Sequence, residues 1–386
     1  MKKIIEKHGL KIIGVVILVL TMLTLTRQGQ ALTKTTIFLY KEISDPLGNK
    51  PSSSITTSTI KEVAYQSRGE TIYADLWIPK AKNPEVGVVL SLGTDIDRGD
   101  QRTLRLAKNL SEAGIVVFSP DIPSLSARRL SDDATVDLVN AFKFLKSDPY
   151  LKDKKVGMMG ICSSGGLVVL AAENPEISSD LAFLVSINPY YDLHNLYRQL
   201  ALRKFSDGED EFTWSPHFKT VEIFNRETID LLKEATDKEI LTDHLLDIEN
   251  EKIAAGDYPP LADQEKKKLT EESIVAFEAL TNRNQDKIEN YFKTATPGQF
   301  TYLLEMSPST KIKNHKAKTF IVADLNSTFF PYTQAKDLSN AIENEVYLES
   351  KLIEFGPVQE KLTVIGKIEE SVKLLPFVYK IFLEIS

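Results

Sequence analysis

One glycine-rich turn holds the residues of this chain that are best suited to covalent chemistry. Cys162, the single cysteine, lies between an apolar run at 155–160 and a second apolar run that starts at Gly165. Glycine on both sides of such a turn lets a strand fold sharply onto a helix, which turns the central side chain outward. The positive end of the helix would then lower the pKa of the Cys162 thiol and favour the nucleophilic thiolate. The backbone N–H of Ser163 would point at an oxyanion formed during attack.

A second interpretation of this turn is purely structural. In that case the glycines pack a strand against a helix, and Cys162 is a small apolar side chain without reactivity. The residue types alone do not decide between the two interpretations, so Cys162 stays a candidate nucleophile.

The residues around the turn predict a mainly parallel, doubly wound α/β sheet. Residues 59–78 alternate apolar and polar side chains around Arg68-Gly69, which is the pattern of a β-hairpin. Four apolar runs that suit strands buried on both faces follow, at 86–92, 115–119, 155–160 and 181–187. Segments with helical spacing separate these runs. This alternation indicates parallel strands joined by right-handed crossovers.

The alternation stops after the sixth predicted strand. Residues from about 193 to 306 are polar with helical spacing, and the β/α pattern resumes with predicted strands at 318–325 and 351–355. An insertion at this point would lie over the carboxyl edge of the sheet, where open α/β folds bind ligands. The sequence therefore predicts one domain over 59–386 with a helical lid at about 193–306.

These features resemble the α/β-hydrolase fold superfamily, nearest to its dienelactone-hydrolase-like and prolyl-oligopeptidase-like esterase branch. The segment Gly160-Ile161-Cys162-Ser163-Ser164-Gly165-Gly166 is similar to the nucleophile elbow G-x-[S/C]-x-G, with Ser164 in place of the second glycine. The resemblance implies a carboxylic-ester or thioester hydrolase with Cys162 as the nucleophile. It also implies that the N–H of Thr94 or Asp95, after the third predicted strand, is the second oxyanion donor.

The resemblance breaks at the two other positions of a catalytic triad. Alignment on Phe330-Pro331 puts the acid at Ser327, which cannot carry the charge that orients and stabilises an imidazolium. Asp324 is a candidate substitute, or else it caps a loop. No histidine follows His315, and Val358 stands where a histidine should follow the last strand. Loss of the base removes an effect of roughly 10²–10⁴-fold in rate.

Another histidine could replace the missing base. Asp192 and His194 follow the sixth predicted strand, at the same sheet edge as the elbow, and could form an unconventional pair with Cys162. The alternative is that they start and cap the first lid helix. His217 and His244 fall inside the predicted lid, and His315 lies on a lysine-rich connector.

The N-terminus predicts a membrane-targeting segment. Lysines precede an uncharged, mostly apolar stretch at 12–26, and Arg27 closes it. Its length falls between that of a cleaved signal peptide and that of a spanning helix, which needs about 17–20 residues. We expect 1–27 to be an uncleaved anchor or a removed signal, with the folded part on the exported side of the membrane. Residues 28–58 are expected to form a stalk, in which the apolar patch 37–40 docks on the domain or on lipid.

The composition argues against several other classes of protein. A net charge of −7 gives no support for nucleic-acid binding. A single cysteine excludes an internal disulfide framework and a cysteine-rich zinc site, and the five histidines lack metal-ligand spacing. We expect neither a metal nor another cofactor.

Two functions stay open at this point. In the first, the protein is catalytically degenerate and binds an acyl-type ligand or a protein partner. In the second, it is a Cys162-dependent esterase or thioesterase-like hydrolase that cleaves a small or lipid-derived ester beneath the lid. The missing acid and histidine favour the first function, and the retained elbow favours the second.

Overall fold

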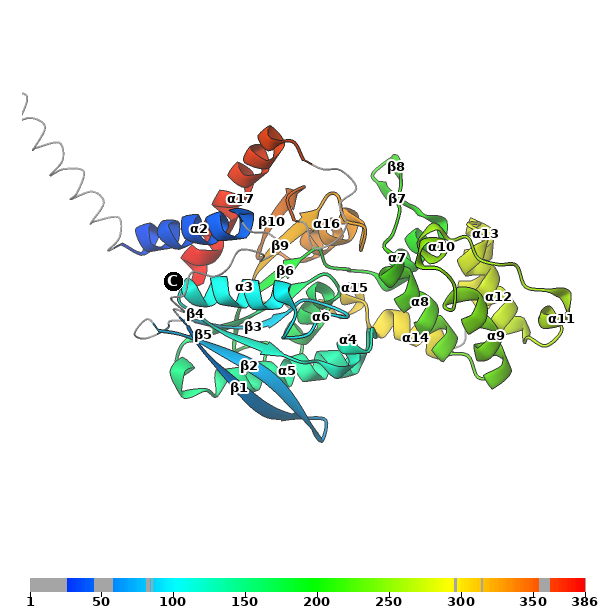
Figure 1. The fold of residues 1–386 in the computed structure, drawn as a ribbon, viewed down its shortest axis with the longest axis horizontal. Helices are drawn as coiled ribbons and strands as arrows, with labels where there is room; N and C mark the ends of the chain where they lie inside the picture. Colours follow the sequence, from blue (N-terminus) through cyan, green and yellow to red (C-terminus); the bar gives the residue numbers. More distant parts are fainter. Residues whose placement is uncertain are drawn as a thin grey trace, which may run out of the picture.

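The computed structural model describes residues 26–44, 58–80, 84, 86–294, 297–313, 315–353 and 362–385 (Figure 1). Most of the apolar stretch 12–26, part of the predicted stalk and Val358 lie outside these residues. In the part that is described, no helix is both long enough and apolar enough to cross a bilayer.

An eight-stranded sheet forms the centre of the molecule, with strand order β1-β2-β4-β3-β5-β6-β9-β10. The strands are β1 (Ser58–Ser67), β2 (Glu70–Pro79), β3 (Val86–Ser91), β4 (Ile115–Pro120), β5 (Lys155–Ile161), β6 (Leu181–Ile187), β9 (Lys318–Asp324) and β10 (Glu345–Ser350). Strand β2 pairs antiparallel with both β1 and β4, and every other pairing in the sheet is parallel. The predicted mainly parallel α/β sheet is therefore confirmed.

The last strand differs from the prediction. The apolar run at 351–355 suggested a strand there, whereas β10 ends at Ser350. Apolar content did not locate this strand because β10 lies at an edge of the sheet, where five of its six residues are only half-buried. The segment that follows the last strand therefore begins at Lys351.

Helices cover both faces of the sheet. Helices α3 (Gln101–Glu112), α17 (Val364–Ile385) and α2 (Arg27–Ser44) enclose one apolar core with the sheet. Helices α5 (Asp132–Lys146), α6 (Ser163–Ala172) and α16 (Tyr332–Ala341) enclose a second core on the opposite face. Short turns at α4 (Pro123–Ser126) and at the 3-10 helix Pro149–Leu151 complete the connections.

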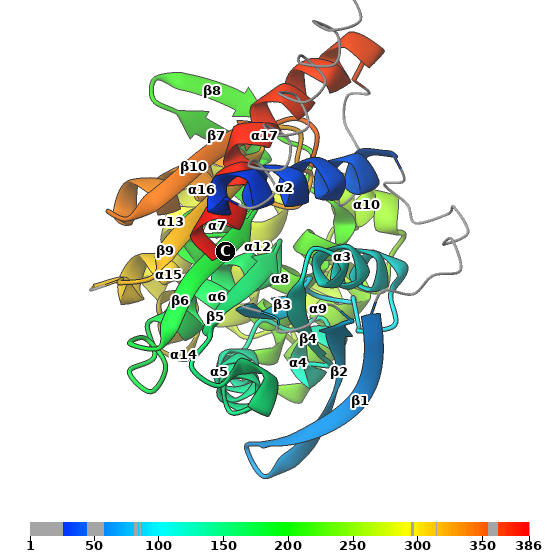
Figure 2. The same ribbon diagram turned by 90° about the vertical axis from the view of Figure 1, so that its left-hand side faces the viewer.

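Helix α2 corrects the expectation of a stalk over residues 28–58. Ala31, Thr35 and Leu39, spaced four residues apart, are buried on one face of α2. That face lies beside α17 and α3 in both views (Figures 1 and 2). The Arg27 guanidinium donates to the carbonyl of Leu383 at 2.5 Å. The turn-forming residues that suggested a stalk follow this helix, so they do not describe residues 27–44.

The insertion between β6 and β9 forms a separate lobe of the same molecule (Figure 1). It comprises α7 (Leu193–Leu202), β7 (Lys204–Asp207), β8 (Asp210–Thr213), α8 (Phe218–Asp230), α9 (Ala235–Leu245), α10 (Asn250–Ala255), α11 (Asp263–Lys266), α12 (Glu271–Thr281), α13 (Gln285–Thr294), α14 (Pro297–Glu305) and α15 (Pro308–Lys311). The prediction of a helical insertion after the sixth strand holds, but it missed the exposed β7–β8 hairpin. The lobe meets the carboxyl edge of the sheet, where the N–H of His217 donates to the carbonyl of Thr328 after β9 at 2.7 Å.

Candidate functional site

Cys162 occupies a strained turn between β5 and α6. Its φ and ψ angles are 57° and −126°, a region that side chains other than glycine rarely adopt. Two hydrogen bonds of 2.8 Å hold this conformation, from the Cys162 N–H to the Ile187 carbonyl and from the Gly165 N–H to the Cys162 carbonyl. Backbone strain of this kind costs about 1–3 kcal/mol, and it clusters at functional sites. The turn therefore has the geometry of a nucleophile elbow.

The glycines of the turn are required by close approaches of other atoms. A Cβ on Gly160 would lie 2.2 Å from the carbonyl oxygen of Ser164, and one on Gly166 would lie 2.5 Å from the Tyr190 ring. A Cβ on Gly165 would lie 3.1 Å from Pro189. Ser164, which replaces the second glycine of the motif, is fully buried and shares a 2.7 Å hydrogen bond with the hydroxyl of Ser91. The elbow therefore tolerates a serine here because β3 supplies a partner for its hydroxyl.

The side chain of Cys162 is half-buried, and its surroundings disfavour the thiolate. Burial raises its pKa to about 12, against a smaller lowering by the Ser163 N–H and by the charge of Arg102. The carboxylate of Asp324 acts with burial and raises this pKa further. This direction is opposite to the sequence-based expectation of a lowered pKa, because the partial charge of a helix end is smaller than the cost of ionising a largely desolvated sulfur.

The two predicted second oxyanion donors are already engaged. The N–H of Thr94 donates to the Ser163 hydroxyl at 3.0 Å, and the N–H of Asp95 donates to the carbonyl of Leu125 at 2.9 Å. The N–H of Ser163, the predicted first donor, acts on the sulfur of Cys162 itself. An oxyanion hole needs donors aimed at the position of the developing charge. This arrangement therefore lacks a preformed pair of donors.

Asp324, the last residue of β9, and Ser327 in the loop after it are the two candidates for the acid position, and their roles differ. The Ser327 hydroxyl accepts the backbone N–H groups of Phe329 and Phe330 at 3.0 and 3.2 Å and the side-chain amide of Asn188 at 2.7 Å. Ser327 is thus a turn-capping residue. Asp324 accepts the N–H of Asn326 at 2.9 Å, and its charge also reaches Cys162. The structure brings Asp324 near the thiol, but as a charge that opposes thiolate formation.

Asp192 and His194 have well-defined roles at the start of the lid. Asp192 is the N-cap of α7 and accepts the N–H of Asn195 at 3.0 Å. The His194 ring lies 3.8 Å from the Phe292 ring of α13, and its Nδ1 lies 3.1 Å from the Arg198 guanidinium. Burial, followed by the charge of Arg198, lowers the pKa of His194. These contacts match the capping and packing alternative for the pair.

The remaining described histidines also have partners outside the elbow. His217 caps α8 by accepting the N–H of Lys219 at 3.2 Å and packs on Phe329. His244 bonds with the carbonyl of Pro259, and His315 bonds with Glu173. The lid places His217 beside the loop after β9. Sequence reasoning did not predict this position. Its role in the lid could not be read from spacing.

Arg102 is the second residue that sequence reasoning missed. It stands in the first turn of α3, pairs with Asp100 at 2.7 Å, and its charge acts on Cys162. A basic residue soon after the loop that follows the third strand was the local signal that could have pointed to it. Within the part of the chain that the structure describes, Arg102 is the cation whose charge favours the Cys162 thiolate.

Ion pairs connect the lid to the loop that carries Thr94. The Asp95 carboxylate pairs with Lys219 of α8 at 2.5 Å and with Arg128 at 3.1 Å. Arg128 also pairs with Glu222 of α8 at 3.1 Å. These ion pairs hold the loop that carries Thr94 and Asp95 in place beneath the lid. Among the residues that the structure describes, no group of three or more His, Cys, Asp or Glu side chains could hold a metal ion.

Comparisons with known proteins find similar solved structures at low sequence identity. No protein-family model and no curated protein sequence matches the chain. Carboxyl esterase 2 from the fungus Tuber melanosporum is 15% identical over 88% of this chain and 90% of its own, with a TM-score of 0.47. Acetyl xylan esterase 1 from Thermoanaerobacterium sp. JW/SL YS485 is 14% identical over 85% and 86%, with a TM-score of 0.44.

A dienelactone hydrolase from Anabaena variabilis ATCC 29413 is also similar. It is 22% identical over 35% of this chain and 65% of its own, with a TM-score of 0.32. At these identities the similarity concerns the fold alone.

Proposed function

We propose that this chain, which has the α/β-hydrolase fold, is catalytically silent and acts by binding an acyl-type ligand. The observation that carries the proposal is that the Thr94 N–H and the Ser327 hydroxyl, which stand where Cys162 would need an oxyanion donor and an acid, are engaged in other contacts. The raised pKa of the half-buried Cys162 thiol also disfavours the nucleophilic thiolate.

Both contacts support the loss of catalysis. The N–H of Thr94 is bonded to Ser163 and is not aimed at a developing oxyanion. The acid position holds Ser327, which caps its own turn, and no histidine follows His315 in the sequence. Nucleophile, acid–base pair and oxyanion hole are the three groups on which this class of hydrolysis depends.

Turnover of activated esters tests the proposal. The full chain, purified in a mild detergent, is mixed with p-nitrophenyl acetate, butyrate and octanoate and with an acyl thioester, beside Cys162→Ala. We expect the two proteins to hydrolyse each substrate at the same rate, because any background reactivity comes from other side chains. A Cys162-dependent rate, or a burst of about one equivalent of product, would contradict the proposal.

The second candidate function is a Cys162-dependent esterase or thioesterase-like hydrolase. The strained elbow and the charge of Arg102 at the sulfur favour it. Such an enzyme would need the lid to move so that a base and a free Thr94 N–H reach the site. The ester panel discriminates the two functions, since only an enzyme loses activity with Cys162→Ala.

We further propose that residues 12–26 tether the protein to a membrane with the folded part on the exported side. An apolar stretch behind a run of lysines supports this location. A fusion to a reporter that folds only outside the cytoplasm tests it. Activity of a reporter attached at the C-terminus is the expected result, and activity of only a cytoplasmic reporter would contradict it.

A further inference from the structure

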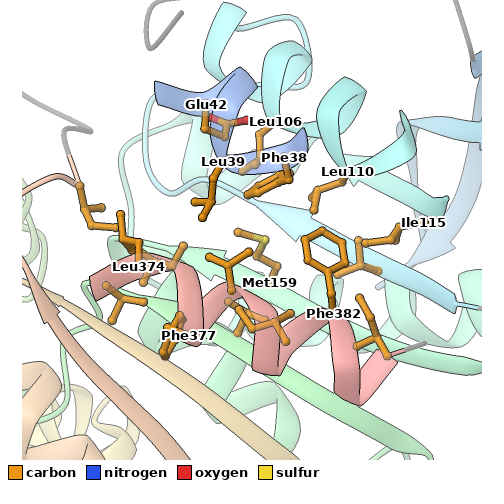
Figure 3. A pocket seen from close by; sticks show the side chains of 18 of the residues that line it. Phe38, Leu39, Glu42, Leu106, Leu110, Ile115, Met159, Leu374, Phe377 and Phe382 are labelled. Carbon is orange, nitrogen blue, oxygen red and sulfur yellow. The ribbon is translucent and has the colours of Figure 1, made fainter. Parts of the chain in front are cut away.

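A cavity of about 200 Å³ lies far from the lid, between α2, α3, α17 and the sheet (Figure 3). Its floor is the face of β3, β5 and β6 that carries Val88, Met159 and Val185. Its walls come from three helices that are distant in sequence, with Phe38 and Phe382 in edge-to-face contact at 5.7 Å. The cavity exists because α2 spans from α17 to α3 without filling the space beneath it.

The lining is apolar except at three residues. The apolar members include Phe38 and Leu39 of α2, Met159 of β5, and Val378 and Phe382 of α17. A dry apolar cavity of about 150 Å³ accepts benzene. By that comparison, a cavity of this size has room for an alkyl chain of medium length.

The charged members of the lining are Glu42, Arg105 and Lys367. The Arg105 side chain is only 13% exposed, and its Nε and Nη1 groups are buried without a hydrogen-bond acceptor. Nε lies 3.2 Å from the Glu42 carboxylate, close enough for an ion pair but not aligned for a hydrogen bond. Glu42 also accepts the side-chain amide of Asn109 at 2.7 Å.

Buried guanidinium N–H groups without acceptors are costly, and a carboxylate is the acceptor that they match best. Among the described lining residues, the largely buried Arg105 and the exposed Lys367 stand against one acid, Glu42. A ligand that satisfies both features has an anionic head group and a hydrocarbon tail.

We propose that this cavity binds one fatty acid, with the chain among the apolar side chains and the carboxylate at Arg105. The inference deepens the proposed function by naming the ligand class and its place, but it does not depend on the state of Cys162. It makes α2 a part of a binding site, because Phe38, Leu39 and Glu42 all belong to that helix.

Photolabelling of the full chain tests the site. The protein is reconstituted in lipid nanodiscs, which avoids detergent in the cavity, and is exposed to a decanoic acid that carries a diazirine. We expect labelled peptides from α2, α17 and β5–β6, with label displaced by unmodified decanoate. Label confined to exposed surfaces, or label that decanoate does not displace, would overturn the proposal.

A matched pair of substitutions on α17 tests occupancy of the cavity. Val378 is 8% exposed and lines the cavity, whereas Val372, on the same helix, is 65% exposed and does not. Val378→Phe fills space that the chain needs, so labelling should fall at least about fivefold, while Val372→Phe should label like the parent. Thermal unfolding confirms that both variants fold. Equal labelling of the two variants contradicts a ligand in this cavity.

A second pair on α3 tests the head group. Arg105→Gln should weaken decanoate binding by roughly 10–100-fold, the usual effect of losing a hydrogen bond to a charged group. Decanol, which has no charge, should bind both proteins alike. Lys108→Gln removes a charge from the same helix without touching the lining and should change neither.

Lysophosphatidylcholine competition separates a fatty acid from a membrane lipid as the source of the chain. Stronger displacement by lysophosphatidylcholine than by decanoate would overturn the assignment of the carboxylate. The ester panel and the labelling fail independently. Cys162-dependent turnover with intact labelling would reject catalytic silence but support the fatty-acid site. No turnover and no labelling would support catalytic silence but reject the fatty-acid site.

Discussion

The hydroxyl of Ser163 accepts the backbone N–H of Thr94 at 3.0 Å, so the elbow itself occupies a donor that an oxyanion would need. Gly93 makes this contact possible. Its φ of 103° is suited to glycine, and a Cβ there would lie 2.8 Å from the Ser163 hydroxyl oxygen. The contact between the Gly93–Thr94 loop and the elbow therefore stabilises a conformation in which the Thr94 N–H is not available to an oxyanion.

Ser163→Ala should destabilise the fold without creating activity. The Thr94 N–H loses its acceptor, which costs about 1 kcal/mol in a partly buried position. Urea denaturation measures this loss, and Ser179→Ala, an exposed serine beyond α6, should change stability by less than about 0.5 kcal/mol. Ester hydrolysis that rises with Ser163→Ala would mean that only the missing donor silences the elbow.

Gly160→Ala should destabilise the protein strongly. The added Cβ would meet the Ser164 carbonyl oxygen at 2.2 Å and Val168 at 2.7 Å, which forces β5 and α6 apart at a cost of about 3 kcal/mol or more. Gly366→Ala is the matched control in α17, because its Cβ would meet nothing closer than 3.4 Å. That variant should gain about 0.5 kcal/mol from helix propensity. Equal unfolding midpoints for the two variants would contradict the elbow packing.

Glu227 should make the lid less stable as the pH rises. Burial raises the pKa of this α8 carboxyl from 4.5 to about 7, despite Arg129 and the Leu130 N–H, which lower it. The folded state therefore keeps a proton that the unfolded chain releases. The stabilisation is complete below about pH 4.5 and is lost as the pH passes through 7.

Glu227→Gln removes this dependence because its side chain stays neutral. Between pH 5 and pH 8 the parent should lose roughly 1–3 kcal/mol more of its unfolding free energy than the variant. Denaturant titrations at the two pH values measure the difference. Glu239→Gln, an exposed acid on α9, should follow the parent. If the unfolding free energies of the parent and of Glu227→Gln change equally with pH, the Glu227 carboxyl is not held protonated in the folded state.

Asp192 should prove to be a helix cap. Asp192→Ala removes the acceptor for the Asn195 N–H and should cost about 1 kcal/mol, whereas Asp192→Asn keeps a cap and should cost far less. Neither variant, nor His194→Ala, should alter the alkylation rate of Cys162. An Asp192→Asn protein that is stable but has a changed Cys162 rate would instead reveal the unconventional pair.

The sheet and the elbow could be predicted because their signals are local. The apolar runs of β3, β4, β5 and β6 have the length and composition of buried strands, and the close approaches at Gly160, Gly165 and Gly166 demand glycine. Edge strand β10 and the β7–β8 hairpin escaped the same reasoning because their residues are half-buried or exposed. Without a buried face, neither has a strong hydrophobic pattern.

The state of the site could not be predicted because it depends on contacts between distant segments. The burial that raises the pKa of Cys162 comes from the folded surroundings, not from neighbours in the sequence. The Ser163–Thr94 bond spans 69 residues, and the contact of Arg27 in α2 with Leu383 in α17 spans 356. Motif spacing placed the nucleophile, but it contained no information on whether the thiol would ionise.

The pH dependence of Cys162 alkylation by iodoacetamide in the full chain is the most direct test of catalytic silence, because the chain has one cysteine and Cys162→Ser supplies the blank. Burial raises the pKa of the thiol to about 12, so the rate at pH 8.5 should be roughly 10²–10³-fold below that of a free thiol. It should still be rising at pH 10. A rate that levels off below pH 8 would mean an activated thiolate at the elbow and would contradict the account.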